Sequence, residues 1–184
     1  MQADFPNSIH TWDDVEDDVD IISGAHMNSA HAECIAIETL LSEQQSNVQA
    51  YRHTSNQSIA SSTLTTLQIQ GELADYLGEY DASSTFYFQP DSPGWFYVHC
   101  TVTLANGEVG KYAVLQAFVD SDSNLRSLFW PTQVDQFVIS IQGDIYITDT
   151  QNLKFTVFHN HSSALAMLYG RDQSYFTIKR RINW

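Results

Sequence analysis

Hydrophobic and polar positions alternate without a break over residues 95–104. Successive side chains of a β-strand point to opposite faces, so this alternation predicts a strand with one buried side. The buried side would carry Phe96, Val98, Cys100, Val102 and Leu104, and the other side Trp95, Tyr97, His99, Thr101 and Thr103.

The rest of the chain from residue 64 onward has a similar pattern, with short apolar segments separated by turn residues. The expected strands are 64–70, 85–88, 112–119, 136–142, 144–148, 153–159, 164–169 and 174–180, and the expected turns are 90–94, 106–107, 120–124, 143–144, 150–152 and 170–172. This spacing, without a helical period between the strands, predicts a mainly β fold, a jelly-roll sandwich of about eight to ten antiparallel strands. The head would occupy residues 67–184, after a polar linker or first strand at 54–66.

Residues 24–53 follow a helical period instead. Small or apolar residues recur in alternating steps of three and four, which is a heptad repeat with one polar interruption, Gln44. Its members are Met27, Ala30, Cys34, Ile37, Leu41, Val48 and Tyr51. The pattern predicts either a short trimeric stalk or an amphipathic helix that packs on its own domain, and three to four heptads do not separate the two.

Negative charge is concentrated in the first third of the chain. The whole chain has a net charge of −14. Ten acidic residues and no basic ones lie between Met1 and Tyr51, so this part of the chain carries −10 of that charge. Nucleic-acid binding needs clustered Lys and Arg, so this distribution argues against such a partner. We therefore expect residues 1–53 to form an extended acidic arm plus one helix that anchors the protein, although a simple solvated charge run has the same composition. The candidate contacts to a basic partner surface are Asp13, Asp14, Glu16, Asp17, Asp18 and Asp20.

Motifs for catalysis, cofactors or metals are not apparent, and we expect a non-enzymatic protein without a cofactor. Two patterns are candidate metal ligands: the pair His159 and His161, and the alternating donors Asp120, Asp122 and Asn124. Polar residues at strand ends and turns are the simpler explanation of both patterns, and the second lacks the glycine and glutamate of an EF-hand loop. The two cysteines predict free thiols, and no apolar run reaches membrane-spanning length.

Two stretches resemble known families. FYFQPDSPGWFYVHCTVTL (86–104) and GDIYITDTQNLKFTVFHNHSSALAMLYGRDQSYFTIKRRI (143–182) resemble complement-type globular heads and tumour-necrosis-factor-like jelly rolls. FPNSIHTWDDVEDDVDIISGAHMNSAHAECIAIETLL (5–41) looks like the N-terminal segments of tailed-phage structural and fibre proteins. The first resemblance implies homotrimers, and the second implies a place on a virus particle.

Together these patterns predict a homotrimeric virion surface protein, made in the host cytoplasm. We expect a capsid decoration (cement) protein or short head fibre, whose partners are its own copies and the major capsid protein or another virion protein. The alternatives are a tail receptor-binding tip that recognises a host surface glycan, and a complement-like or cytokine-like ligand.

Overall fold

The computed structural model describes residues 28–37, 46–132 and 135–181. The chain divides into two compact units, Met1–Glu43 and Gln44–Trp184. In the first unit the described residues form one helix, 28–37, and all of them are exposed. Among the residues that the structure describes, no helix is long and apolar enough to cross a membrane.

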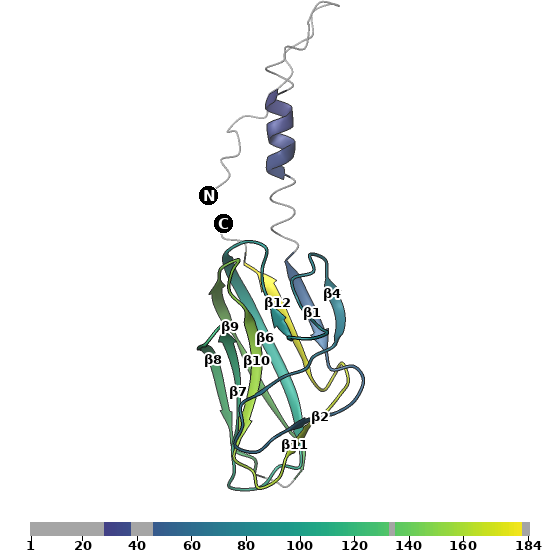
Figure 1. Ribbon diagram of the computed structural model, residues 1–184, viewed down its shortest axis with the longest axis vertical. Coiled ribbons are helices and arrows are strands. Elements are labelled where there is room, and N and C mark those ends of the chain that lie inside the picture. Colours follow the sequence, from purple (N-terminus) through teal and green to yellow (C-terminus); the bar gives the residue numbers. More distant parts are fainter. Residues whose placement is uncertain (1–27, 38–45, 133–134, 182–184) are drawn as a thin grey trace, which may run out of the picture. The chain divides into compact units, whose positions relative to one another are not determined.

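The second unit consists of two antiparallel sheets (Figure 1). Its strands are β1 (Asn47–Tyr51), β2 (Gln57–Ile59), β3 (Thr65–Thr66), β4 (Gly71–Asp75), β5 (Tyr87–Phe88), β6 (Gly94–Ala105), β7 (Ala113–Val119), β8 (Asp122–Phe129), β9 (Phe137–Ile147), β10 (Leu153–His159), β11 (Leu165–Met167) and β12 (Tyr175–Arg180). The mainly β prediction is therefore confirmed. The strand number exceeds the prediction because β1, β4 and β8 lie outside the expected strands, whereas the two strands expected at 136–142 and 144–148 form one strand, β9.

The larger sheet is organised around β6, its longest strand. β9 pairs with one side of β6 along its whole length, while β12 and then β11 pair with the other side. β1 and β4 extend the sheet beyond β12, and β2 extends it beyond β11. In the smaller sheet β10 lies between β7 and the two short strands β3 and β5, and β8 forms the far edge.

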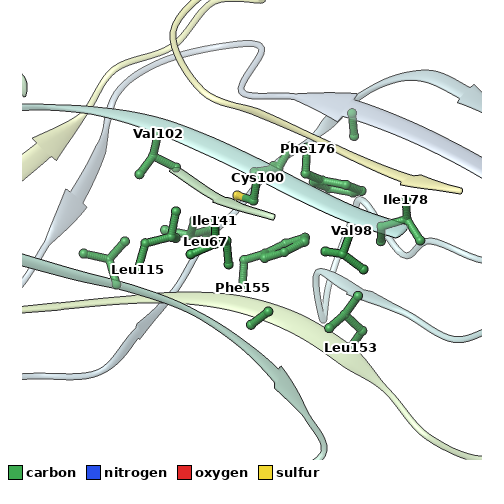
Figure 2. Close-up of a cluster of buried hydrophobic side chains, with 14 of the residues drawn as sticks. Leu67, Val98, Cys100, Val102, Leu115, Ile141, Leu153, Phe155, Phe176 and Ile178 are labelled. Carbon is green, nitrogen blue, oxygen red and sulfur yellow. The ribbon is translucent and has the colours of Figure 1, made fainter. Parts of the chain in front are cut away.

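The inward sides of the two sheets enclose one hydrophobic core (Figure 2). All five residues predicted for the buried side of β6 are fully buried. Phe176 of β12 packs against Phe155 of β10 with ring centroids 5.1 Å apart, so the two sheets meet through aromatic contacts. At about 25 cal/mol per Å² of apolar surface, burial on this scale dominates the stability of the head.

The structure corrects the predicted end of the helix. Residues 47–51 form β1, which pairs with both β12 and β4. Val48 and Ala50 point into the core and Tyr51 points outward, as alternation in a strand requires. Val48 and Tyr51 are three residues apart, a step that also fits a heptad, and for this reason the sequence pattern was misleading there.

Two predicted turns also differ from the structure. Residues 143–144 continue β9 without a turn, and Asp122 already begins β8. Gly143 faces the other sheet, where an added Cβ would lie 2.7 Å from a side-chain carbon of Leu125. The glycine thus marks a close approach between the two sheets and not a reversal of the chain.

Candidate interaction face

The outward side of the larger sheet carries half-exposed aromatic residues on three adjacent strands. We call this surface the aromatic face and define it by Trp95, Tyr97 and His99 of β6, Gln142, Asp144 and Tyr146 of β9, Tyr175 of β12, and Arg181 just beyond β12. Its outward orientation follows from alternation, because the residues between these positions belong to the core. Trp95 is 45% exposed and Tyr146 49% exposed, which is unusual for such large apolar groups.

Cross-strand pairing determines which of these side chains meet. Trp95 lies opposite Tyr146, and their rings form an edge-to-face pair with centroids 5.6 Å apart. His99 meets Tyr175 with the same centroid distance. Such pairs add about 0.5–1.5 kcal/mol beyond the burial of their area, so the rings are held in place before any partner binds.

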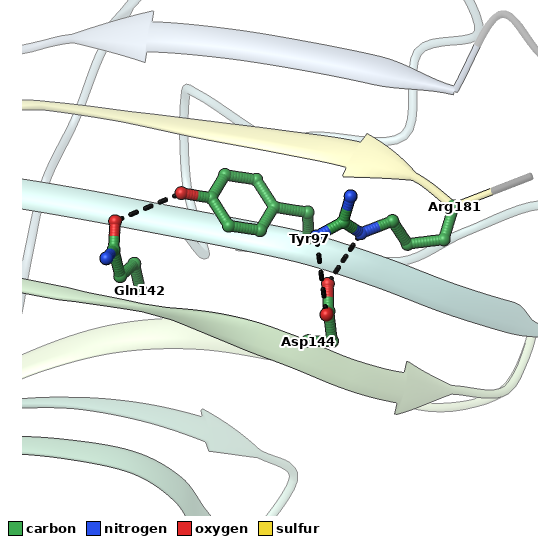
Figure 3. Close-up of polar contacts among 4 residues, drawn as sticks. All are labelled: Tyr97, Gln142, Asp144 and Arg181. Atoms are coloured by element: carbon green, nitrogen blue, oxygen red, sulfur yellow. Dashed lines mark hydrogen bonds and ion pairs between the residues drawn. The ribbon is translucent and has the colours of Figure 1, made fainter.

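A polar network crosses the same face (Figure 3). The Tyr97 hydroxyl donates to Oε1 of Gln142 at 3.1 Å. Arg181 donates through Nε to one carboxylate oxygen of Asp144 at 2.7 Å and through Nη2 to the other at 3.3 Å. The guanidinium also lies over the Tyr97 ring, 4.9 Å from its centroid. The carboxylate raises the pKa of Arg181 above its ordinary value, mainly through the hydrogen bond.

The outward side of the smaller sheet has a separate aromatic group. Tyr112 lies between Trp130 and Phe158, with ring centroids 5.1 and 6.1 Å away. Trp130 is 51% exposed. Because the two groups lie on opposite sheets, Trp95 and Trp130 provide matched probes of the two surfaces.

The histidine pair lies inside the head and not on its surface. The side chains of His159 and His161 are both buried, with ring centroids 5.3 Å apart. Nδ1 of each ring accepts a backbone N–H, and Nε2 of His159 lies 2.9 Å from the Ile59 carbonyl oxygen. Neither ring is therefore presented on the surface of the single chain.

The second candidate metal pattern is distributed between a turn and a strand. Asp120 has a left-handed backbone with φ of 53° and accepts the N–H of Asn152, while Asp122 and Asn124 belong to β8. Within 28–37, 46–132 and 135–181, no group of three or more His, Cys, Asp or Glu residues could hold a metal ion.

An acid-lined hollow of about 450 Å³ lies near the start of β5. Two of its four carboxylates are bound by neighbouring groups: Glu79 accepts from Ser46 and from the N–H of Asp91, and Asp81 accepts from residues 83–85. The latter bonds hold the pKa of Asp81 far below its usual range. The other two acidic residues that line the hollow are Asp91 and Asp149.

Of the predicted anchor residues, Ala30, Cys34 and Ile37 lie on the helix and are exposed. Cys34 and Cys100 are free thiols, with Cys100 in the core. Met27, Leu41 and the six acidic residues between Asp13 and Asp20 lie outside the described residues, so their predicted roles remain predictions.

Three residues of the aromatic face were predicted on one side of a strand: Trp95, Tyr97 and His99. Their partners on β9 were missed, because residues 136–148 were divided at Gly143. The available signal was the alternation itself, which continues through the glycine from Phe137 to Ile147.

No family model and no curated protein matches the sequence of this chain. Solved structures do match its fold. The Eiger TNF of S. frugiperda has a TM-score of 0.54 at 8% identity, covering 75% of this chain and 93% of that chain. Murine APRIL at pH 5.0 has a TM-score of 0.55 at 9% identity, covering 73% and 98%. The chain therefore has a tumour-necrosis-factor-like jelly-roll fold, in line with the resemblance drawn from its sequence.

Proposed function

We propose that this chain is a homotrimeric, non-enzymatic virion surface protein that decorates an assembled capsid. In this proposal the head associates through its aromatic face, and the acidic N-terminal unit attaches the trimer to the major capsid protein or another virion protein. The protein would be made in the host cytoplasm and would function without a cofactor, nucleic acid or membrane.

The aromatic face is the observation that carries the self-association. It combines Trp95, Tyr146 and Tyr97 with an arginine, the residue types enriched at protein interfaces. Its rings and its Arg181–Asp144 pair are held in place within one subunit, which lowers the entropy lost on binding. Three copies are proposed because the resemblance to complement heads and tumour-necrosis-factor-like jelly rolls implies trimers.

The helix supports a second point of association. Ala30, Cys34 and Ile37 follow the heptad spacing within 28–37 and are exposed in the single chain. Three such helices would cover one another's apolar stripes. The resemblance of residues 5–41 to tailed-phage structural proteins, with the acidic run inside them, supports attachment to a particle.

Light scattering on the purified full chain tests the trimer. The mass should be about three times the 20.8 kDa of one chain. Trp95→Glu should lower this mass, because it places a charge inside the proposed contact, whereas the matched variant Trp130→Glu on the other sheet should remain trimeric. A monomeric wild-type protein at micromolar concentration, or dissociation by the Trp130 variant alone, would refute the assignment.

The second candidate function is a tail receptor-binding tip, and the Tyr112–Trp130–Phe158 group favours it. Exposed tilted rings on a surface away from the proposed subunit contact are suited to stacking against a sugar of a host glycan. A cytokine-like ligand is the third candidate, and the two solved structures named above favour it through fold alone. Loss of adsorption on Trp130→Ala would favour the receptor tip.

A further inference from the structure

His159 and His161 connect three segments at one end of the sandwich. Nε2 of His159 lies within hydrogen-bond distance of the Ile59 carbonyl oxygen. The backbone carbonyl of His159 accepts the N–H of Ser62. Its Nδ1 accepts the N–H of His161 at 3.2 Å. Nδ1 of His161 accepts the N–H of Glu108 at 3.0 Å. The loop after β6, the end of β2 and the segment after β10 are thereby tied together.

The rings are enclosed by aromatic neighbours from the other strands. Phe129 of β8, Phe137 of β9 and His161 form a continuous stack, with centroid distances of 5.2 and 6.1 Å and interplanar angles below 10°. His159 meets His161 edge to face, with ring centroids 5.3 Å apart. The buried imidazole of His161 therefore has an apolar ring stacked on one face and a backbone N–H at its Nδ1.

These hydrogen bonds assign the proton of each neutral ring. A nitrogen that accepts an N–H must have a free lone pair, so both Nδ1 atoms are unprotonated and both protons are on Nε2. Nε2 of His159 then donates to Ile59, while Nε2 of His161 is buried without a partner. Protonation of His161 would add a hydrogen at Nδ1, directly facing the N–H of Glu108.

We infer that the His159–His161 pair is an acid-sensitive latch that closes the head at neutral pH and releases residues 106–112 when His161 is protonated. The charged groups facing His161 are the Glu108 carboxylate and Lys111, and His159 is the remaining titratable neighbour. The carboxylate is bound to the N–H and hydroxyl of Ser162, both at 2.9 Å. It therefore offsets only part of the cost of a buried imidazolium.

The direction of the effect follows from linkage. Burial, followed by the proximity of His159, lowers the pKa of His161 from its ordinary value of 6.5. The open state then binds the proton more tightly than the closed state, so the latch contributes its full stability above about pH 6.5 and loses it as the pH falls toward the depressed pKa. One linked proton can increase the open population by at most about tenfold between pH 7.5 and pH 5.5.

Amide hydrogen exchange on the full-length protein tests the latch. After correction for intrinsic rates, exchange at the N–H groups of Glu108 and His161 should become faster as the pH falls from 7.5 to 5.5, by up to about tenfold. His161→Asn should abolish this dependence, because its Oδ1 occupies the position of Nδ1 as an acceptor that does not titrate. His53→Asn, at an exposed histidine, should behave like the wild type.

Two results would overturn the inference. One is wild-type exchange at these amides that does not change with pH after correction. The other is a dependence that persists in His161→Asn. If that variant does not fold, the ¹⁵N chemical shifts of the wild-type rings decide: a proton on Nδ1 of His161 at pH 7.5 would contradict the latch.

Discussion

At the scale of single residues, the Arg181–Asp144 ion pair contributes a different free energy in the free subunit and in the associated subunit. In the free head the pair is about half exposed, and such pairs contribute about 0–1 kcal/mol. Covered by a neighbouring copy, Arg181 without its partner would be a buried, unpaired charge, which typically costs about 2–5 kcal/mol.

Asp144→Ala should therefore weaken trimer association by more than about tenfold while changing the stability of the isolated head little. Sedimentation equilibrium measures the association constant of the trimer. The stability of the isolated head is measured by denaturant unfolding, with Asp144→Ala introduced into the Trp95→Glu variant, which we expect not to form the trimer. Asp122→Ala, at an exposed position on β8, is the control. Equal association constants for the two alanine variants would show that the pair lies outside the contact.

A second residue-scale prediction concerns the core. The buried Tyr80 hydroxyl donates to the Ile69 carbonyl at 2.7 Å, and burial raises the tyrosine pKa far above its usual range. Tyr80→Phe leaves that carbonyl without its donor and should lower the free energy of unfolding by about 1–3 kcal/mol. Urea titration measures the change, and Tyr76→Phe at an exposed position should have almost no effect. Equal stability of the two variants would contradict this account.

At the scale of elements, β1 sets the boundary of the head. It lies between β12 and β4, and it places Val48 and Ala50 in the core. Deletion of residues 1–43 removes the first unit and leaves this strand, whereas deletion of residues 1–53 removes the strand itself.

The shorter deletion should leave a cooperatively folding β protein, and the longer one should unfold it or reduce its melting temperature strongly. Loss of β1 exposes the edge of β12 and opens the core beneath it, and both effects are destabilising. Circular dichroism with thermal melting measures both proteins. Similar melting temperatures would mean that β1 contributes little to the fold.

The strand β1 also illustrates which strands can be predicted from the sequence and which cannot. The long strands β6, β7, β10 and β12 were predicted because their alternation extends over six or more residues. β8 was not predicted, because its first residues, Asp122 to Asn124, are polar and were expected to form a turn. β1 was assigned to the helix because Val48 and Tyr51 are one heptad step apart, and only pairing with β12, more than a hundred residues away, identifies the strand.

The candidate interaction face was also predicted only in part. Alternation placed Trp95, Tyr97 and His99 on one face, but their partners depend on register between strands. Register is a long-range property, and here Gly143 concealed the continuity of β9. The burial of His159 and His161 was likewise hidden, because adjacent polar residues after a strand usually indicate a turn.

At the scale of the whole molecule, the proposed decoration function makes a prediction about particles. A protein that binds the assembled shell and not the free capsid subunit stabilises the shell by mass action. Three anchors on one trimer would act multivalently and raise the effective concentration at the surface. Because ten acidic residues lie between Met1 and Tyr51, part of the affinity should come from basic capsid residues and should weaken as salt screens them.

Particles that lack this protein should therefore assemble and adsorb to cells normally, but should release their genome at a lower temperature than complete particles. Adding back the purified full chain should restore heat resistance, and the variant without residues 1–43 should not, since it retains the head but lacks the proposed anchor. Genome release can be followed with a DNA-binding dye during heating, and adsorption by counting unbound particles. Unchanged heat resistance combined with lost adsorption would contradict decoration and would assign the protein to the tail tip.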